Sequence, residues 1–243
     1  VMTMARGLYP IYQAENKEEI LAGLNDGSIP ISTYMLEGFR FFKELVDQGY
    51  YGDGLTADYV DTLKANTTDW ENFKSGAVAF AVFTSGKQDD MERYVPDMDY
   101  IMQGIPALPD GTVSLPAIST RLCVNAKGSH VDQALKVLDY LTVHERSNLN
   151  KGGNGIMPVF RDEEVEQSPK LQAIYDDVSS PGQIPIEDMS LCFDYWGTIR
   201  TLCLEIIDGA TPEEAAAAYD RIQQEAVAGQ SVVTGGELGR EGT

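Results

Sequence analysis

An aromatic side chain and a guanidinium lie four residues apart near the carboxyl end of the chain, at Trp196 and Arg200. Residues four apart share one face of a helix, so the two groups would be neighbours there. An indole can stack on the C–H face of a sugar ring, and a guanidinium donates several hydrogen bonds to hydroxyl groups. The pair therefore has the chemistry to bind a carbohydrate. The alternative is a core Trp beside an Arg that is paired with an internal carboxylate.

The segment that carries this pair has the spacing of a packed helix from 196 to 207. Apolar side chains recur at i, i+3, i+4 and i+7, at Ile199, Leu202, Cys203 and Ile206. Arg200 projects inside the apolar arc of the same helix, where a buried charge would need a polar partner. Gly209 predicts the end of the helix. Thr211–Glu214 predicts the start of the next, with a Thr N-cap, Pro at the first helical position and Glu at the third.

Acidic residues dominate the charge of the 243-residue chain. Its 38 Asp and Glu outnumber its 18 Lys and Arg, which gives a formal net charge of −20. Such a charge repels the phosphates of nucleic acids and anionic membrane surfaces, so we expect neither as a partner. The sequence contains no apolar run of about 18 residues, the length that predicts a transmembrane helix. These properties favour a protein that binds neutral or cationic small molecules.

The motifs of common catalytic and metal sites are absent from the sequence. It has no HExxH, GxSxG, GxxxxGKS/T or GxGxxG pattern. The two histidines, His130 and His144, offer little to a catalytic triad or a zinc site. Cys123, Cys192 and Cys203 lack the spacing of metal ligands, and we expect small buried side chains there. We therefore expect no catalytic residue, no metal site and no cofactor, and predict that the protein is not an enzyme.

Short apolar runs alternate with segments of helical spacing, which predicts an α/β fold. The predicted strands are 7–13, 77–83, 99–105 and 121–126, and the predicted helices among them are 16–24, 32–46, 69–76 and 133–141. Ala77–Phe83 is apolar on both faces, as expected of a strand buried in a parallel sheet. Thr84, Ser85 and Gly86 follow it at its carboxyl end, the edge at which ligands of open α/β sheets bind.

Several segments resemble, in their order and spacing, one family of proteins. They are Phe73–Phe80, Gly104–Pro109, Leu122–Ala126 with Ala134–Leu141, Gly155–Pro158 and Gly209–Ala215. The chain resembles the extracellular solute-binding proteins of ABC transporters, in the sugar-binding group that includes maltose-binding protein. The likeness covers residues 5–228.

The resemblance implies ligand-binding roles for three residues of the predicted helix and its start. Trp196 and Arg200 look like the stacking Trp and the Arg four positions later on the family's last long helix. Tyr195 stands where the family has another aromatic residue.

Two loops complete the set of ligand-binding residues that the resemblance implies. The family's strand-end loop matches Thr84, Ser85 and Gly86, where the two hydroxyls would add hydrogen bonds and Gly86 replaces a second stacking Trp. That departure argues against maltose and for a different or smaller sugar. The family's early ligand loop matches Gln13–Lys17, which includes Glu15.

The architecture that the resemblance implies is a two-lobed, type II periplasmic-binding-protein fold with mostly the second lobe present. Residues 1–116 would begin that lobe, 117–150 would cross into the first lobe, 151–228 would complete the second, and 229–243 would be a disordered tail. Family members carry a signal peptide, often a lipid-anchored Cys, and a first lobe, so the resemblance implies that this chain is N-terminally incomplete. We expect it to bind ligand more weakly than a complete parent, which would be extracellular, as a cell-surface lipoprotein or in the periplasm.

The leading hypothesis is the substrate-binding component of an ABC importer. It would be a monomer that binds a sugar or oligosaccharide between its lobes and delivers it to the transporter permease. A second hypothesis keeps the fold but binds a cationic solute such as a polyamine, caged by carboxylates such as Asp194, although Arg200 in the cleft argues against it. A third is a glycoside-cleaving enzyme, since carboxylates are abundant.

Overall fold

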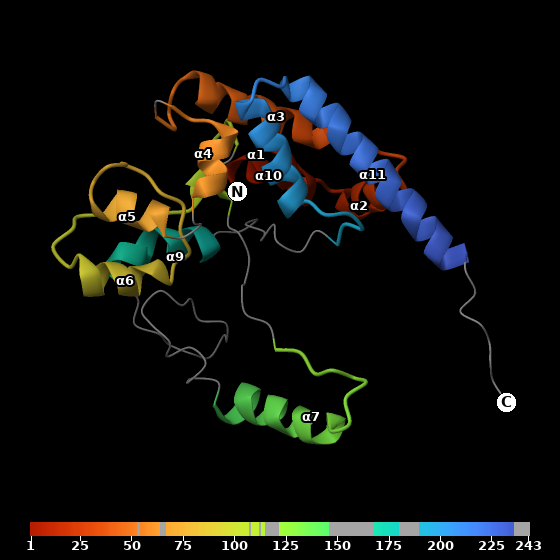
Figure 1. Ribbon diagram of the computed structural model, residues 1–243. Coiled ribbons are helices and arrows are strands. Elements are labelled where there is room, and N and C mark those ends of the chain that lie inside the picture. Colours follow the sequence, from red (N-terminus) through yellow and green to blue (C-terminus); the bar gives the residue numbers. More distant parts are fainter. Residues whose placement is uncertain are drawn as a thin grey trace. The chain divides into compact units, whose positions relative to one another are not determined.

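A computed structural model describes residues 1–52, 54–63, 67–106, 108–111, 113–114, 122–145, 168–179 and 190–235 (Figure 1). The chain divides into two compact units. The first consists of Val1–Lys64, Ile105–Ala117 and Ile184–Thr243, and the second of Ala65–Gly104 and Ile118–Gln183. The lobe boundaries implied by the family resemblance stay predictions.

Helices contain most of the described residues. The first unit holds α1 (Met2–Gln13), α2 (Lys17–Asp26), α3 (Ser32–Asp47), α4 (Ala57–Thr62), α10 (Trp196–Ile207) and α11 (Pro212–Gly235). The second holds α5 (Thr68–Lys74), α6 (Lys87–Tyr94), α7 (Val131–Asp139), the π-helical turn η1 (Tyr140–His144), the 3-10 turn η2 (Pro169–Leu171) and α9 (Gln172–Ser179). The strands are β1 (Ile105–Pro106) and β2 (Val113–Ser114), which form an antiparallel pair in the first unit.

The expected α/β fold is wrong. Among the described residues the only strands are the short pair β1 and β2, so these residues contain no parallel sheet for helices to cover. The predicted strand 7–13 lies within α1, 99–105 contributes only Ile105, and 77–83 and 122–126 are irregular. Residue 121 lies outside the described residues. The two-lobed type II architecture, which depends on such sheets, is overturned with them.

The segment Ala77–Phe83 shows why its prediction failed. Its apolar side chains predicted a strand buried on both faces, yet Phe80 is 91% exposed and Val82 47% exposed. A strand is stable only when a neighbouring strand accepts its backbone hydrogen bonds and other side chains cover its faces. Among the described residues no strand pairs with this segment, and most of its side chains are exposed, although Phe83 packs against the rings of Trp70 and Phe73. The apolar run alone is therefore insufficient evidence for a buried strand.

Helix α1 forms because its buried residues recur with helical spacing, despite Gly7 and Pro10. Its core-facing side chains are Met4, Ala5, Leu8, Tyr9, Ile11 and Tyr12. This face packs against α3, and Gly7 and Gly38 allow the two backbones to approach closely. A Cβ on Gly7 would lie 2.5 Å from the Sδ of Met35, and a Cβ on Gly38 would collide with the backbone oxygen of Thr3.

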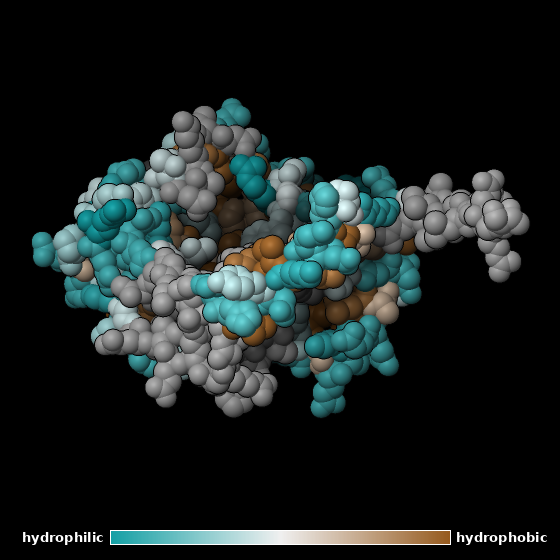
Figure 2. Space-filling view, turned by 90° about the horizontal axis from the view of Figure 1, so that it is seen from below, coloured by the Kyte–Doolittle hydropathy of each residue, from teal (hydrophilic) through white to brown (hydrophobic). Residues whose placement is uncertain are grey.

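Helices α10 and α11 complete the core of the first unit. Phe39 of α3, Phe193 before α10 and Tyr219 of α11 are buried together; the Tyr219 ring lies 6.5 Å from Phe39 and 5.9 Å from Phe193. In Figure 1, α10 and α11 lie beside α1 and α3, as their contacts require. Among the residues coloured in Figure 2, most of the visible surface is hydrophilic and the apolar patches are smaller, as expected from the acidic composition.

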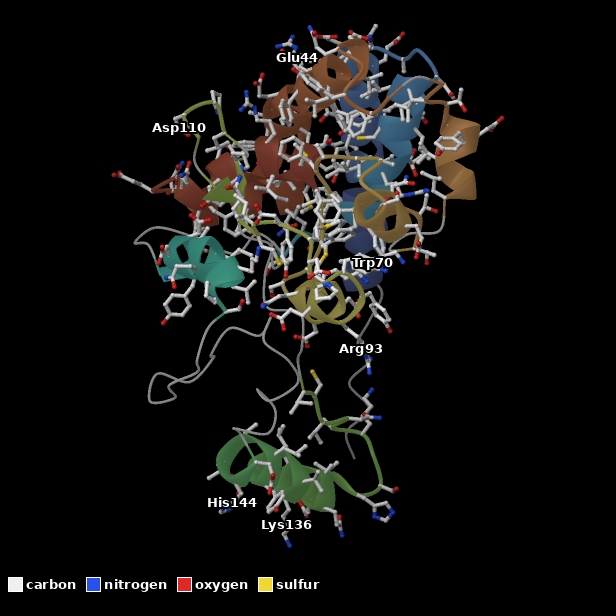
Figure 3. The ribbon with its side chains drawn as sticks, turned by 90° about the vertical axis from the view of Figure 1, so that its left-hand side faces the viewer. Glu44, Trp70, Arg93, Asp110, Lys136 and His144 are labelled. Carbon is white, nitrogen blue, oxygen red and sulfur yellow. The ribbon has the colours of Figure 1, made fainter. Side chains whose placement is uncertain are left out.

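In the second unit, aromatic side chains join α5 to the segment before α6. Trp70, labelled in Figure 3, is 9% exposed, and its ring lies 6.2 Å from the ring of Phe83 in an edge-to-face arrangement. The ammonium groups of Lys74 and Lys87 lie 5.5 and 4.6 Å from the Trp70 ring. Such cation–π contacts stabilise a small helical unit modestly.

Several helices are confirmed close to their predicted bounds. They include α2, α3, α5, α7 and α10, together with the start of α11. Gly27, at φ 78°, follows the last residue of α2, which extends two residues past the predicted end at 24. Helix α11 continues through Gly235, so residues 229–235 of the expected disordered tail are helical, and 236–243 lie outside the described residues.

Candidate functional site

The apolar stripe predicted for α10 attaches this helix to the core. Ile199, Leu202 and Ile206 are buried, and Cys203 is half-buried against them. This placement turns the opposite face of the helix toward solvent. Arg200 directly follows buried Ile199, so it lies about 100° from it on a flank of the helix, where it is exposed. The expectation that its guanidinium lies within the apolar arc is wrong. The exposure of Trp196 and Arg200 also excludes a buried position for either side chain, which the alternative of a core Trp and an internal Arg required.

The Asp194 carboxylate closes the first turn of α10. Its Oδ2 accepts hydrogen bonds from the backbone N–H of Thr198 at 2.8 Å and from the Thr198 hydroxyl at 3.3 Å. A Cβ on Gly197 would lie 2.7 Å from the same Oδ2, so the glycine gives the carboxylate room. An acidic group here satisfies an otherwise unpaired helix N–H and favours the positive end of the helix dipole. Asp194 thus holds the start of α10 in place.

Two aromatic rings lie side by side at this helix start. The rings of Tyr195 and Trp196 are 6.2 Å apart with an angle of 35° between their planes. Tyr195 is half-buried against the core, whereas Trp196 is 39% exposed. Arg200 follows one turn later on the same side of α10. An indole fixed by a neighbouring ring, with a guanidinium next to it, is a surface that can stack on a sugar ring and donate to its hydroxyls.

The hydroxyl of buried Tyr219 in α11 contacts the residues that begin α10. It donates a 3.5 Å hydrogen bond to the backbone oxygen of Asp194, and burial raises the pKa of this phenol. A tyrosine phenol is already protonated at neutral pH, and the raised pKa keeps this one a donor in more alkaline solution as well. The helix start is thereby connected to both α11 and the core.

The other predicted ligand residues lie elsewhere in the chain. Glu15 is exposed in the turn between α1 and α2 of the first unit. Thr84, Ser85 and Gly86 belong to the second unit, where the backbone oxygens of Thr84 and Ser85 accept hydrogen bonds from the first residues of α6. Thr84 and Gly86 are exposed and Ser85 is half-buried. Because 77–83 is not a strand, this loop does not follow the end of one, and its ligand-binding role stays a prediction.

A groove of about 430 Å³ lies between α10 and α11, and sequence reasoning missed it. Its polar lining residues are Asp194, Thr198, Thr201, Glu205, Arg221 and Glu225. Trp196 and Arg200 are not among the described residues that line it. The α11 residues that line the groove, Ala218, Arg221, Ile222 and Glu225, are spaced so that they share one helix face. This spacing can be seen in the sequence, but only the packing of the two helices shows that the face meets α10.

The described residues contain no group of three His, Cys, Asp or Glu side chains placed to hold a metal ion. None of their helices is long and apolar enough to cross a membrane.

Comparison with known proteins gives a distant similarity to binding proteins. The chain is 24% identical over 139 residues to "Putative binding protein BAB2_0491" of Brucella abortus (strain 2308) and, equally, to "Putative binding protein BRA0748/BS1330_II0741" of Brucella suis biovar 1. The match covers 57% of this chain and 32% of each relative, so the chain spans about a third of their length. No family model and no solved structure matches. The similarity thus indicates a binding role and names no ligand.

Proposed function

We propose that this chain is part of a non-enzymatic solute-binding protein that binds a sugar or oligosaccharide. One observation carries the proposal: Trp196 is 39% exposed, its ring lies beside that of Tyr195, and exposed Arg200 follows one turn later. A large aromatic side chain that remains exposed beside a hydrogen-bond donor is typical of a binding surface. The distant similarity to binding proteins supports the same class.

The transport context belongs to this proposal as well. The order of the sequence motifs resembles solute-binding proteins of ABC importers, so the bound sugar would be delivered to a transporter permease. The longer protein would then act outside the cytoplasmic membrane, as a lipoprotein or in the periplasm. The low charge of sugars suits the strongly acidic chain, since no electrostatic repulsion opposes their approach.

The test is calorimetric titration of a panel of neutral oligosaccharides into the chain and into the Trp196→Ala variant. We expect at least one sugar to bind, and its affinity to fall about tenfold or more in the variant, which is ~1.4 kcal/mol of lost stacking. Tyr50→Ala is the matched control, because Tyr50 is 75% exposed in the same unit and lies outside the proposed site. Circular dichroism checks that both variants keep their helices.

Two outcomes would contradict the proposal. One is that no sugar in the panel binds, or that Tyr50→Ala and Trp196→Ala weaken binding equally. The other is release of reducing ends from the oligosaccharides by the purified chain, which would identify a glycoside-cleaving enzyme instead.

A further inference from the structure

The chain segment that precedes α10 is held by Asn25, a residue in the last turn of α2. The side-chain Nδ2 of Asn25 donates a 2.9 Å hydrogen bond to the backbone oxygen of Ser190, and its Oδ1 accepts one of 2.7 Å from the backbone N–H of Cys192. The backbone oxygen of Asn25 also accepts a 3.4 Å hydrogen bond from the Cys192 thiol. One residue of α2 therefore binds segment 190–192 at three atoms.

Ser190 has a strained backbone conformation. Among the residues that the structure describes, it is the only non-glycine residue with a positive φ, at 49°. A side chain with a Cβ disfavours this region, so the conformation persists only where the surrounding contacts hold it. Ser190 is exposed, so burial of its own side chain does not hold it, whereas the Asn25 hydrogen bonds fix the backbone from its carbonyl to Cys192. Strain of this kind is concentrated at functional sites.

The segment held by Asn25 leads directly to the aromatic pair. Three residues separate Cys192 from Trp196. The first of them, Phe193, is buried with its ring 5.9 Å from that of Tyr219. Asn25 fixes the start of this short connection and Phe193 anchors it in the core, which leaves the backbone that enters α10 little freedom. The position of the indole at the surface therefore depends on α2 as well as on α10.

We propose that Asn25 is a positioning residue for the carbohydrate surface. It would not contact the sugar, but it would hold segment 190–192 so that the Trp196 ring keeps one orientation before a ligand arrives. A ring that is ordered in advance loses less conformational entropy when a sugar stacks on it, so binding is tighter. The effect on affinity rests on the proposed function, whereas the order of the ring can be measured without any sugar.

The experiment labels the chain with 5-fluorotryptophan and records its ¹⁹F NMR spectrum without sugar. The chain has two Trp residues, and loss of one resonance in Trp196→Phe assigns the other to Trp70 of the second unit, an internal reference. Asn25→Ala should shift and broaden the Trp196 resonance and leave that of Trp70 unchanged. The affinity for the sugar that the parent binds should fall about three- to tenfold, because the ring must then be ordered on binding. Asn25→Asp, which keeps the acceptor for Cys192 but loses the donor to Ser190, should give intermediate changes.

Gly38→Ala is the matched control for lost stability. It strains the packing of α1 on α3 in the same unit, and its new Cβ would meet atoms of Thr3 and Gly7, away from segment 190–196. It should leave the Trp196 resonance and the sugar affinity unchanged, and circular dichroism checks that each variant keeps its helices. The proposal is overturned if Asn25→Ala leaves the Trp196 resonance or the sugar affinity unchanged, or if Gly38→Ala alters both equally. A parent that binds no sugar would refute the proposed function, and the sugar-free spectra would still decide whether Asn25 orders the ring.

Discussion

The side-chain amide of Gln223 is fully buried, and its Oε1 accepts a 2.8 Å hydrogen bond from the backbone N–H of Ile31. Its Nε2 donates to the backbone oxygens of Leu24 at 2.7 Å and Ile29 at 2.9 Å. One side chain of α11 thus satisfies three backbone groups around the loop between α2 and α3. This connects the C-terminal helix to elements formed by the first part of the chain.

Replacing Gln223 by Met should lower the free energy of unfolding of the first unit by roughly 3 kcal/mol. The variant keeps the side-chain volume but removes the partner of three backbone groups. Two of these hydrogen bonds, to the Ile31 N–H and the Leu24 oxygen, are buried, and each such group costs about 1–3 kcal/mol when no water can reach it. Urea denaturation measures the loss, and hydrogen exchange should show faster exchange of the Ile31 amide.

Gln224→Met is the control. Gln224 is exposed and donates to the backbone oxygen of Gly27, so the expected loss of unfolding free energy is below about 0.5 kcal/mol. Equal losses in both variants would contradict the role of Gln223.

The close approach of α1 and α3 predicts opposite effects for two Gly-to-Ala changes. In Gly38→Ala the new methyl group would collide with the backbone oxygen of Thr3, and we expect a net destabilisation of about 1–2 kcal/mol. Gly229→Ala in α11 meets no atom within 4 Å, so the better helix propensity of Ala should stabilise the protein by about 0.5–1 kcal/mol. Thermal unfolding of the two variants should shift in opposite directions. A stable Gly38→Ala protein would show that α1 and α3 do not pack this closely.

Local patterns in the sequence predicted the helices, whereas features that depend on distant contacts escaped prediction. The apolar spacing of α10 and the cap at Thr211 are local, and both are confirmed. The short apolar run 7–13 predicted a strand, but it belongs to α1. Gly7 and Pro10 are poor helix formers, and the packing of α1 on α3 overrides that preference. The strand predicted at Ala77–Phe83 required partners that no local pattern can guarantee.

The candidate site likewise has features that local spacing predicts and features that depend on distant contacts. Trp196 and Arg200 were found from their spacing, but their exposure depends on which face of α10 meets the core. The groove needs α10 and α11 to pack side by side, so its acidic lining could not be inferred from either helix alone.

The three cysteines should differ in their reactivity toward iodoacetamide. Burial raises the pKa of the Cys203 thiol to about 11, so only about one molecule in a thousand is a thiolate at pH 8. Cys123 is exposed, contrary to the expectation that all three cysteines are buried, and Cys192 is half-buried. Mass spectrometry after a short reaction at pH 8 should therefore find Cys123 labelled first and Cys203 last. In urea all three should react at similar rates, and rapid labelling of native Cys203 would contradict its burial.

The cap of α11 should make stability depend on pH at the acidic end. The Glu214 carboxylate accepts hydrogen bonds from the backbone N–H and the hydroxyl of Thr211, both 2.9 Å long. These bonds, the backbone one most, hold the pKa of Glu214 below its ordinary value of 4.5. Glu214 in turn donates its backbone N–H to the Thr211 hydroxyl at 3.1 Å, which completes a reciprocal cap. Because the pKa is lower in the folded state, the charged carboxylate stabilises the protein above pH 4.5, and this stabilisation is lost as the pH falls through the folded-state pKa.

The Glu214→Gln variant isolates this charge, since Gln keeps the length and the polar character of the side chain. Its thermal midpoint should lie below that of the parent at pH 7, where Glu214 carries its charge at the positive end of α11. At pH 3 the two midpoints should approach each other, because the parent carboxylate becomes protonated and its advantage disappears. Glu44→Gln should leave the midpoint almost unchanged at both pH values, as Glu44 is an exposed residue outside any cap. A difference between Glu214→Gln and the parent that stays constant from pH 7 to pH 3 would show that the carboxylate charge does not stabilise the helix start.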